Sequence, residues 1–445
     1  MSGRAARRAL ALLAFLAGWL VLTAAPASAH VEIVSSTPGD GSRLTASPAQ
    51  VSVTLSENVG IQPGSLKVVD TQGTAVDTGP VFQPGDVAEE VAVRLRPDLP
   101  DGSYLVEYAF VSSDSHPVRG TFAFVVGAGP LITSAGAVAA ATGTDPVVDV
   151  VSTVVRWLSF AGVVLLGGLV FLLTCHPAGR ADPRARRLLR AGVRLTAATA
   201  IATFLLQGPY AAGRGLGALL DTGLLGDTLR LSYGKLLLVR LVAAGVLAWV
   251  LPRVLTAPAA SARRGRLENL AMITGFAVLL SFSASGHPVT DRVMYFSVAA
   301  DLVHWGAIAV WAGGLVQLTL CLVRRTPDLG PVVTGFSRLA MNCVALIAIS
   351  GGVLALRIVP SVSALWTTTY GLLLLGKIAG FAVLLLVANV ARRAVLKGVA
   401  GGGEGGTAVL TTELRRLRLA VTTEVALASV VLALAAVLSA TPPGG

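Results

Sequence analysis

The sequence is poor in cysteine and in charge. It has three cysteines, and none of them lies between residues 30 and 145. A disulfide framework is therefore excluded for that region. Charged residues make up only 13% of the 445 residues, whereas hydrophobic residues make up 54%. A soluble chain carries about twice that share of charge, so we expect most of this one to lie in a lipid bilayer.

Signatures of ATP-driven proteins and of nucleic-acid-binding proteins are also absent. The chain contains no G-x-x-x-x-G-K-[ST] loop and no D-K-T-G-T motif. Any transport must then depend on a gradient, on facilitated diffusion or on transfer to a partner. Residues 146–445 carry a charge of +16, from 27 Lys and Arg against 11 Asp and Glu, whereas residues 30–145 carry −8; the chain as a whole has a net charge of +11. No basic groove with interleaved aromatic residues accompanies this charge, so no nucleic acid partner is expected.

Residues 1–29 have the features of a secretory signal peptide. Three arginines within the first eight residues precede an apolar run, and the triplet Ala27-Ser28-Ala29 supplies the small residues that a signal peptidase requires. Cleavage after this triplet makes His30 the first residue of the mature protein. The alternative is an uncleaved membrane anchor.

Residues 30–128 alternate between apolar and polar side chains in short runs. Stretches such as "VSVTL" and "YLVEYAF" are bounded by the turn signals "TPGDG", "DTQG" and "LPDG". This period of two predicts the strands of an antiparallel β-sandwich or barrel. Residues 129–147 are rich in small residues and are interpreted as a linker.

A candidate metal site lies at the two ends of this exported domain. The segment "VSSDSHPVRG" places Asp114 two residues before His116, and Pro117 favours an extended backbone there, so both side chains are expected on one side. The mature amine and the imidazole of His30 form a chelate. With Asp114 and His116 this gives three nitrogen ligands and one oxygen ligand, a set that suits tetragonal Cu(II). Glu57 is a weak axial candidate.

A simpler interpretation of these residues is also open. Asp114 could cap a turn, and His116 and Glu57 could be exposed surface residues. Methionine is absent from residues 30–145, so a thioether site for Cu(I) is not expected in this domain.

The stretches "HVEIVSSTPGDGSRL", "VSVTLSENV" and "GSYLVEYAFVSSDSHPVRGTFAFVVG" resemble the CopC family of periplasmic copper-binding proteins. The resemblance implies an immunoglobulin-like β-barrel and a Cu(II) site formed by the N-terminal amine, His30, Asp114 and His116. This chain has Glu32 where many members have another histidine, and it lacks the methionine-rich Cu(I) segment of some members.

Eight apolar segments between residues 148 and 440 are long enough to cross a bilayer, at about 20 residues per crossing. The loops that we assign to the cytoplasm contain 19 Lys and Arg residues, and the opposite connections contain 5. By the positive-inside rule, the exported domain and the C-terminus lie outside the cytoplasm. The predicted spans are 149–174, 191–212, 232–252, 268–286, 294–322, 336–357, 370–391 and 416–439.

The membrane domain also repeats itself. "SYGKLLLVR", which ends at Arg240, aligns with "TYGLLLLGK", which ends at Lys377, at an offset of 137. "GGLVFLLTC" from Gly167 aligns with "GGLVQLTLC" from Gly313 at an offset of 146. The matches predict two parallel repeats of four all-α spans each, an arrangement known in transporters.

Ionisable residues inside spans are candidate functional residues because they are costly in a bilayer. Asp301 and His304 are three apart on one helical face, and His287 precedes that helix. These three form a candidate copper path; the alternative is that His304 serves packing through a hydrogen bond to Asp301 or to a carbonyl. Cys175 and Cys321 are a candidate Cu(I) exit at the cytoplasmic side, or packing residues.

The segments "GHP", "DLVHWGAIAVWAGGL" and "TTTYGLLLLGKIAG" resemble the CopD family of inner-membrane copper-transport proteins. A CopC domain ahead of a CopD domain is the arrangement of YcnJ-type copper uptake proteins. The resemblance implies copper transport across the cytoplasmic membrane, in uptake or resistance, with copper as cargo and an extracytoplasmic chaperone or reductase as a candidate partner. A haem- or copper-based electron carrier and, less favoured, a copper oxidative enzyme remain alternatives; we expect no enzyme.

Overall fold

The structure is a computed structural model of the chain and describes most of its residues. The described ranges are 33–55, 59–60, 65–86, 89–112, 117–131, 145–258, 261–285, 294–324, 329–359, 361–400 and 407–441.

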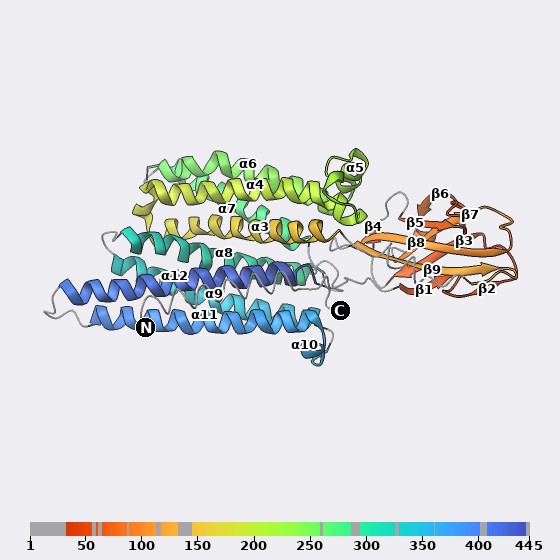
Figure 1. Ribbon diagram of the computed structural model, residues 1–445. Helices are drawn as coiled ribbons and strands as arrows, with labels where there is room; N and C mark the ends of the chain where they lie inside the picture. Colours follow the sequence, from red (N-terminus) through yellow and green to blue (C-terminus); the bar gives the residue numbers. More distant parts are fainter. Residues whose placement is uncertain are drawn as a thin grey trace.

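The N-terminal domain is a sandwich of two β-sheets (Figure 1). One sheet has the strand order β1-β3-β7-β6, and the other has the order β2-β9-β8-β4, with β5 also paired to β8. The predicted all-β class is confirmed. The strands are β1 (Ile33–Thr37), β2 (Arg43–Leu44), β3 (Gln50–Leu55), β4 (Val59–Gly60), β5 (Leu66–Val69), β6 (Asp77–Phe82), β7 (Glu90–Leu95), β8 (Gly102–Ser112) and β9 (Pro117–Val126).

The space between the sheets is filled by apolar side chains. Val51 and Val53 on β3 pair with Val93 and Val91 on β7, and all four are fully buried. In the facing sheet, the Tyr104 and Phe124 rings stack with centroids 5.5 Å apart. These are the positions at which the two-residue period of the sequence predicts inward-facing side chains.

The described segments next to the candidate copper ligands of the exported domain converge at one end of the sandwich. Ile33 at the start of β1 pairs with Leu55 at the end of β3. Val59, four residues further on, pairs with Ser112 at the end of β8. The long β8–β9 hairpin closes at the same end, since Val111 pairs with Pro117. This end of the sandwich faces the helical domain (Figure 1).

The rest of the chain is a bundle of long helices (Figure 1). Its first helix begins at the sequence Asp145-Pro146: the Asp145 side chain accepts hydrogen bonds from the Val147 and Val148 amides, and proline occupies the first helical turn. The helices are α3 (Pro146–Thr174), α4 (Pro183–Ala212), α5 (Thr222–Arg230), α6 (Ser232–Thr256), α7 (Ala262–Ser283), α8 (Met294–Arg324), α9 (Leu329–Ile358), α10 (Ala364–Thr367), α11 (Thr369–Ala400) and α12 (Thr407–Leu438).

Seven of the helices in the described ranges are long and apolar enough to cross a membrane: α3, α4, α6, α8, α9, α11 and α12. The remaining predicted span, 268–286, falls on α7, which begins with the charged sequence "ARRGRLE" and is not among the seven. The short helices α5 and α10 were not predicted; both lie in connections at the sandwich side. The chain is thus a membrane protein, and the count of eight spans stays a prediction.

The repeat-related glycines meet in space. α3 and α8 pack so closely that a Cβ at Gly167 would overlap the Ala309 carbonyl, and a Cβ at Gly313 would overlap the Val164 carbonyl. Small residues allow this approach of two helix backbones, as is common in membranes. The contact joins the first helices of the two predicted repeats, although the repeat itself remains a prediction.

Candidate functional site

A cavity of about 520 Å³ lies in the sandwich-side half of the helical bundle. It is lined by residues of α3, α4, α6, α7, α8, α9, α11 and α12. The charged residues that line it lie seven to ten residues from the start of their helices, about 10–15 Å below the sandwich-side end. They are Arg156, Arg240, Asp301 and Lys377, with His304 at the same level.

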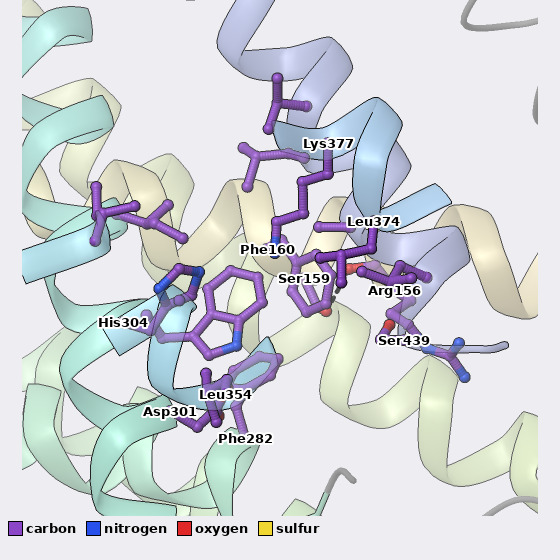
Figure 2. A pocket seen from close by; sticks show the side chains of 18 of the residues that line it. Arg156, Ser159, Phe160, Phe282, Asp301, His304, Leu354, Leu374, Lys377 and Ser439 are labelled. Atoms are coloured by element: carbon purple, nitrogen blue, oxygen red, sulfur yellow. Dashed lines mark hydrogen bonds between the residues drawn. The ribbon is translucent and has the colours of Figure 1, made fainter. Parts of the chain in front are cut away.

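Asp301 and Lys377 reach this cavity from different helices. Figure 2 shows the Lys377 side chain extending from α11 into the space that Asp301 and His304 line from α8. The Asp301 carboxylate is close enough to Lys377 for their charges to interact, and Ser283 of α7 lies beside it. Among the described residues, the two groups do not form a direct ion pair.

The orientation of His304 is fixed by α9. Its Nδ1 lies 3.0 Å from Ser350 Oγ, and Ser350 Oγ donates to the Leu346 carbonyl at 2.5 Å. Because the serine proton is used in that second bond, the oxygen accepts from His304 Nδ1–H. The network therefore assigns the lone pair to Nε2, the form of imidazole that a metal ion requires.

Arg240 is buried, with 3% of its surface exposed. Its Nε donates to Ser281 Oγ and its Nη2 to the Ser281 carbonyl, both at 3.0 Å. Its guanidinium carbon also lies 3.4 Å from the centre of the Phe282 ring. Arg240 and Lys377, which the internal repeat aligns, thus line one cavity. The internal repeat in the sequence marks Arg240 and Lys377 as equivalent positions, but neither was predicted as a site residue. Arg156 was not predicted either.

Aromatic rings form part of the cavity wall. The Phe160 and Trp305 rings lie 4.2 Å apart, and Phe282 lies 6.0 Å from Phe160. Trp311 meets Phe381 edge to face at 5.8 Å. Apolar walls lower the local dielectric, so charges at this site interact more strongly than they would in water.

The remaining predicted site residues are not brought to this cavity by the described structure. His30, Glu57, Asp114, His116 and His287 lie outside the described residues. In the ranges that the structure covers, no group of three His, Cys, Asp or Glu side chains gathers closely enough to hold a metal ion.

The cysteines lie toward the opposite end of the bundle. Cys175 is the C-cap of α3 and is partly exposed, and Cys321 is buried on α8. Both pack in the large apolar core of the helical domain, together with Cys343. Their packing role is therefore visible, and a Cu(I) exit at Cys175 and Cys321 stays a prediction.

Three family models match separate parts of the chain. The model of the CopC domain matches residues 33–127, that of the N-terminal domain of copper resistance protein D-like proteins matches 147–295, and that of copper resistance protein D matches 330–438. The copper resistance protein C of Pseudomonas syringae pv. tomato is 38% identical over 118 residues, which cover 90% of that protein and 25% of this chain. This chain belongs to the CopC family through its sandwich, which is called the CopC domain below. The two models of copper resistance protein D match its helical bundle, which is called the CopD domain below.

Other relatives align with one or both domains. The copper transport protein CutJ of Bacillus subtilis is 27% identical over 384 residues, which cover 83% of this chain and 68% of that protein. The copper resistance protein D of P. syringae is 34% identical over 140 residues, 28% of this chain and 44% of that protein. The crystal structure of CopC from Methylosinus trichosporium OB3b covers 22% of this chain and 93% of its own, with 29% identity and a TM-score of 0.20.

The matches support a copper-related function for the CopC–CopD chain. The two CopD models leave residues 296–329, which include most of α8, between them. Asp301 and His304 lie between the two models, within the long stretch that aligns with CutJ.

Proposed function

We propose that this protein captures Cu(II) outside the cytoplasm with its CopC domain and passes copper through its CopD domain across the cytoplasmic membrane. The ligands for capture are the His30 amine and imidazole, Asp114 and His116. The excess of basic residues in the loops at the opposite side of the bundle supports this orientation. No ATP-binding motif accompanies the domain, so transfer follows a copper gradient or a partner that takes up or reduces the ion.

The convergence of three chain segments carries the proposal. The chain start before Ile33, the connection between Leu55 and Val59, and the β8–β9 turn all leave the sandwich at the end that faces the helical bundle. His30 and Glu57 lie within three residues of described strand ends there, and Asp114 and His116 belong to the turn. A site at this end is close to the mouth of the CopD cavity.

The cavity offers copper a first stop inside the CopD domain. His304 Nε2 is a nitrogen donor whose partner Ser350 holds the ring in place, and Asp301 adds an oxygen donor on the same helix. Lys377 and Arg240 add positive charge around them. Net positive surroundings keep the ion from being held too tightly, and a transported ion must be released as well as bound.

The capture step can be tested on the full-length protein. Paramagnetic resonance during a Cu(II) titration is expected to show one tetragonal copper with nitrogen ligands for the chain that starts at His30. A version with one extra alanine before His30 loses the amine chelate and should lose most of that affinity. Equal binding by both versions would contradict capture at His30.

The transfer step has a separate readout. In proteoliposomes that contain the purified protein, His304→Gln should lower uptake of radioactive copper about tenfold and leave the paramagnetic signal unchanged. His176→Gln is the control, because His176 lies in the turn after α3, away from the cavity. Unchanged uptake by His304→Gln would remove His304 from the path.

A further inference from the structure

An arginine of the CopC domain is joined to the end of a CopD helix. Arg119 lies on β9, where it pairs with Ala109 of β8. Its Nη2 donates to the Tyr210 carbonyl at 2.9 Å and also to the Ala211 carbonyl. These are among the last residues of α4, some 90 positions further along the chain. The contact is therefore between the two domains.

The chemistry of a helix C-terminus explains why a cation lies there. The last carbonyls of an α-helix lack partners within the helix and carry the negative end of its dipole. α4 ends at Gly213, whose backbone is left-handed, and its amide bonds to the Pro209 carbonyl. The guanidinium of Arg119 supplies donors to two of the carbonyls that follow. Arginine suits this position because its planar group donates several hydrogen bonds at once.

Arg119 is partly buried and lies near a carboxylate of the CopD domain. Burial lowers the pKa of Arg119 from its ordinary value, and Tyr210 and the Asp149 carboxylate of α3 oppose that effect. Even so, a guanidinium stays charged at neutral pH. A partly buried cation that faces a helix C-terminus and a carboxylate is stabilised in that position and would be costly to leave without them.

The same contact connects the capture site with the cavity. Arg119 follows His116 by three residues on the β8–β9 hairpin. Tyr210, whose carbonyl accepts from Arg119, also lines the cavity. A single hydrogen bond, from Arg119 to Tyr210, thus links the β8–β9 hairpin to a residue of the cavity wall.

We propose that Arg119 is a positioning residue that docks β9 of the CopC domain on the C-terminus of α4, next to the CopD cavity. The inference rests on the proposed function, since it names how captured copper is presented to the membrane domain. Without this contact, the CopC domain would lose the hydrogen bonds of Arg119 to α4 that fix its orientation on the CopD domain. Docking raises the effective concentration of the loaded site at the cavity.

The test compares Arg119→Gln with a matched control in the full-length protein. Arg43→Gln is that control, because Arg43 also donates to two backbone carbonyls, those of Gly127 and Gly129, which lie just after β9 and not in the CopD domain. We expect Arg119→Gln to bind one tetragonal Cu(II) like the unchanged protein and to take up copper about tenfold more slowly at low copper concentration. Arg119→Lys, which keeps the charge but not the planar group, should recover part of the rate.

A distance measurement keeps the proposal testable if uptake is slow for another reason. Nitroxides at Thr71→Cys in the sandwich and Leu220→Cys before α5, in a background with the native cysteines replaced by alanine, report the orientation of the two domains. Arg119→Gln should broaden the distance distribution, and Arg43→Gln should leave it narrow. A narrow distribution and normal uptake in Arg119→Gln would overturn docking while leaving the proposed function intact. Absence of uptake by the unchanged protein would instead overturn the proposed function.

Discussion

The interiors of the two domains are built on opposite principles. Between the sheets of the CopC domain, the fully buried side chains are apolar, such as Val53, Phe110 and Phe124. The CopD domain instead surrounds a cavity with Arg240, Asp301 and other charged or polar groups. The comparison indicates that the CopC domain acts through its edges and turns, whereas the CopD domain acts through its inside.

Charged residues inside the CopD bundle cost free energy. A charge inside a bilayer-spanning bundle is expensive, and replacing it by an apolar group of similar size is often neutral or stabilising. Charges at Arg240, Asp301 and Lys377 therefore need a reason other than stability. If the comparison is right, substitutions at the CopD cavity should change transport more than stability. Substitutions in the apolar core of the CopC domain, or where helices of the CopD domain pack together, should change stability more than transport.

The largest loss of stability is expected at the contact between α3 and α8, where no additional side-chain atom fits. Gly313→Leu would drive a side chain into the Val164 carbonyl and the Gly167 backbone, and backbone atoms cannot move away without separating α3 from α8. We expect a loss of at least about 3 kcal/mol in stability, seen as a much lower unfolding temperature in detergent. Transport should fall only because less protein is folded.

A second glycine gives the matched control. Gly245 is exposed on α6, and a Cβ there would meet no atom within 4 Å. Gly245→Leu should leave the unfolding temperature nearly unchanged. Equal damage by both variants would mean that helix propensity, and not the close approach of α3 and α8, determines the result.

The next effect concerns a buried charge. Arg240→Met keeps an unbranched side chain as far as the position of Nε and removes the guanidinium, and Ser281 Oγ keeps its bond to the Val278 carbonyl. We expect an unfolding temperature within about 4 °C of the unchanged protein. With one positive charge fewer in the cavity, copper should be held more tightly and released more slowly. Uptake should then show both a lower half-saturation concentration and a lower maximal rate, by about tenfold.

The control for this prediction is an arginine at the surface of the same helix. Arg253 lies over the Trp249 ring at 4.2 Å and donates to the Trp249 carbonyl. Arg253→Met should leave both kinetic parameters within about twofold, since exposed charges are screened. If Arg240→Met lowered the unfolding temperature strongly and left uptake per folded molecule unchanged, Arg240 would be a structural brace and the comparison would fail.

The sequence predicts the two folds well because each has a strong period. Alternation at Val51, Val53, Val91 and Val93 predicted strands that the structure confirms. Long apolar runs predicted helices at each expected position, since backbone groups in a bilayer must be satisfied within a helix. The α7 segment shows the limit: its charged first turns leave it outside the helices that are apolar enough to span.

The cavity was harder to predict because it depends on which helices become neighbours. Asp301 and His304 stood out on one helix, but Ser350 lies 46 residues beyond His304, and nothing local to either residue indicates that they bond. Arg156 and Lys377 come from opposite ends of the domain sequence. Arg119 carried no signal either, since an arginine on a strand is ordinarily a surface residue.

The smallest effect tests a buried hydrogen bond in the CopC interior. Tyr104 is 3% exposed, and its hydroxyl donates to the Pro100 carbonyl at 2.8 Å. Tyr104→Phe keeps the ring stacked on Phe124 and removes only that bond. We expect a loss of about 1 kcal/mol, read from hydrogen exchange of the β8–β9 amides in the full-length protein. Copper uptake should not change, because the affected atom lies far from both the turn and the cavity. A change in uptake without a change in exchange would show that the CopC interior, too, takes part in transport.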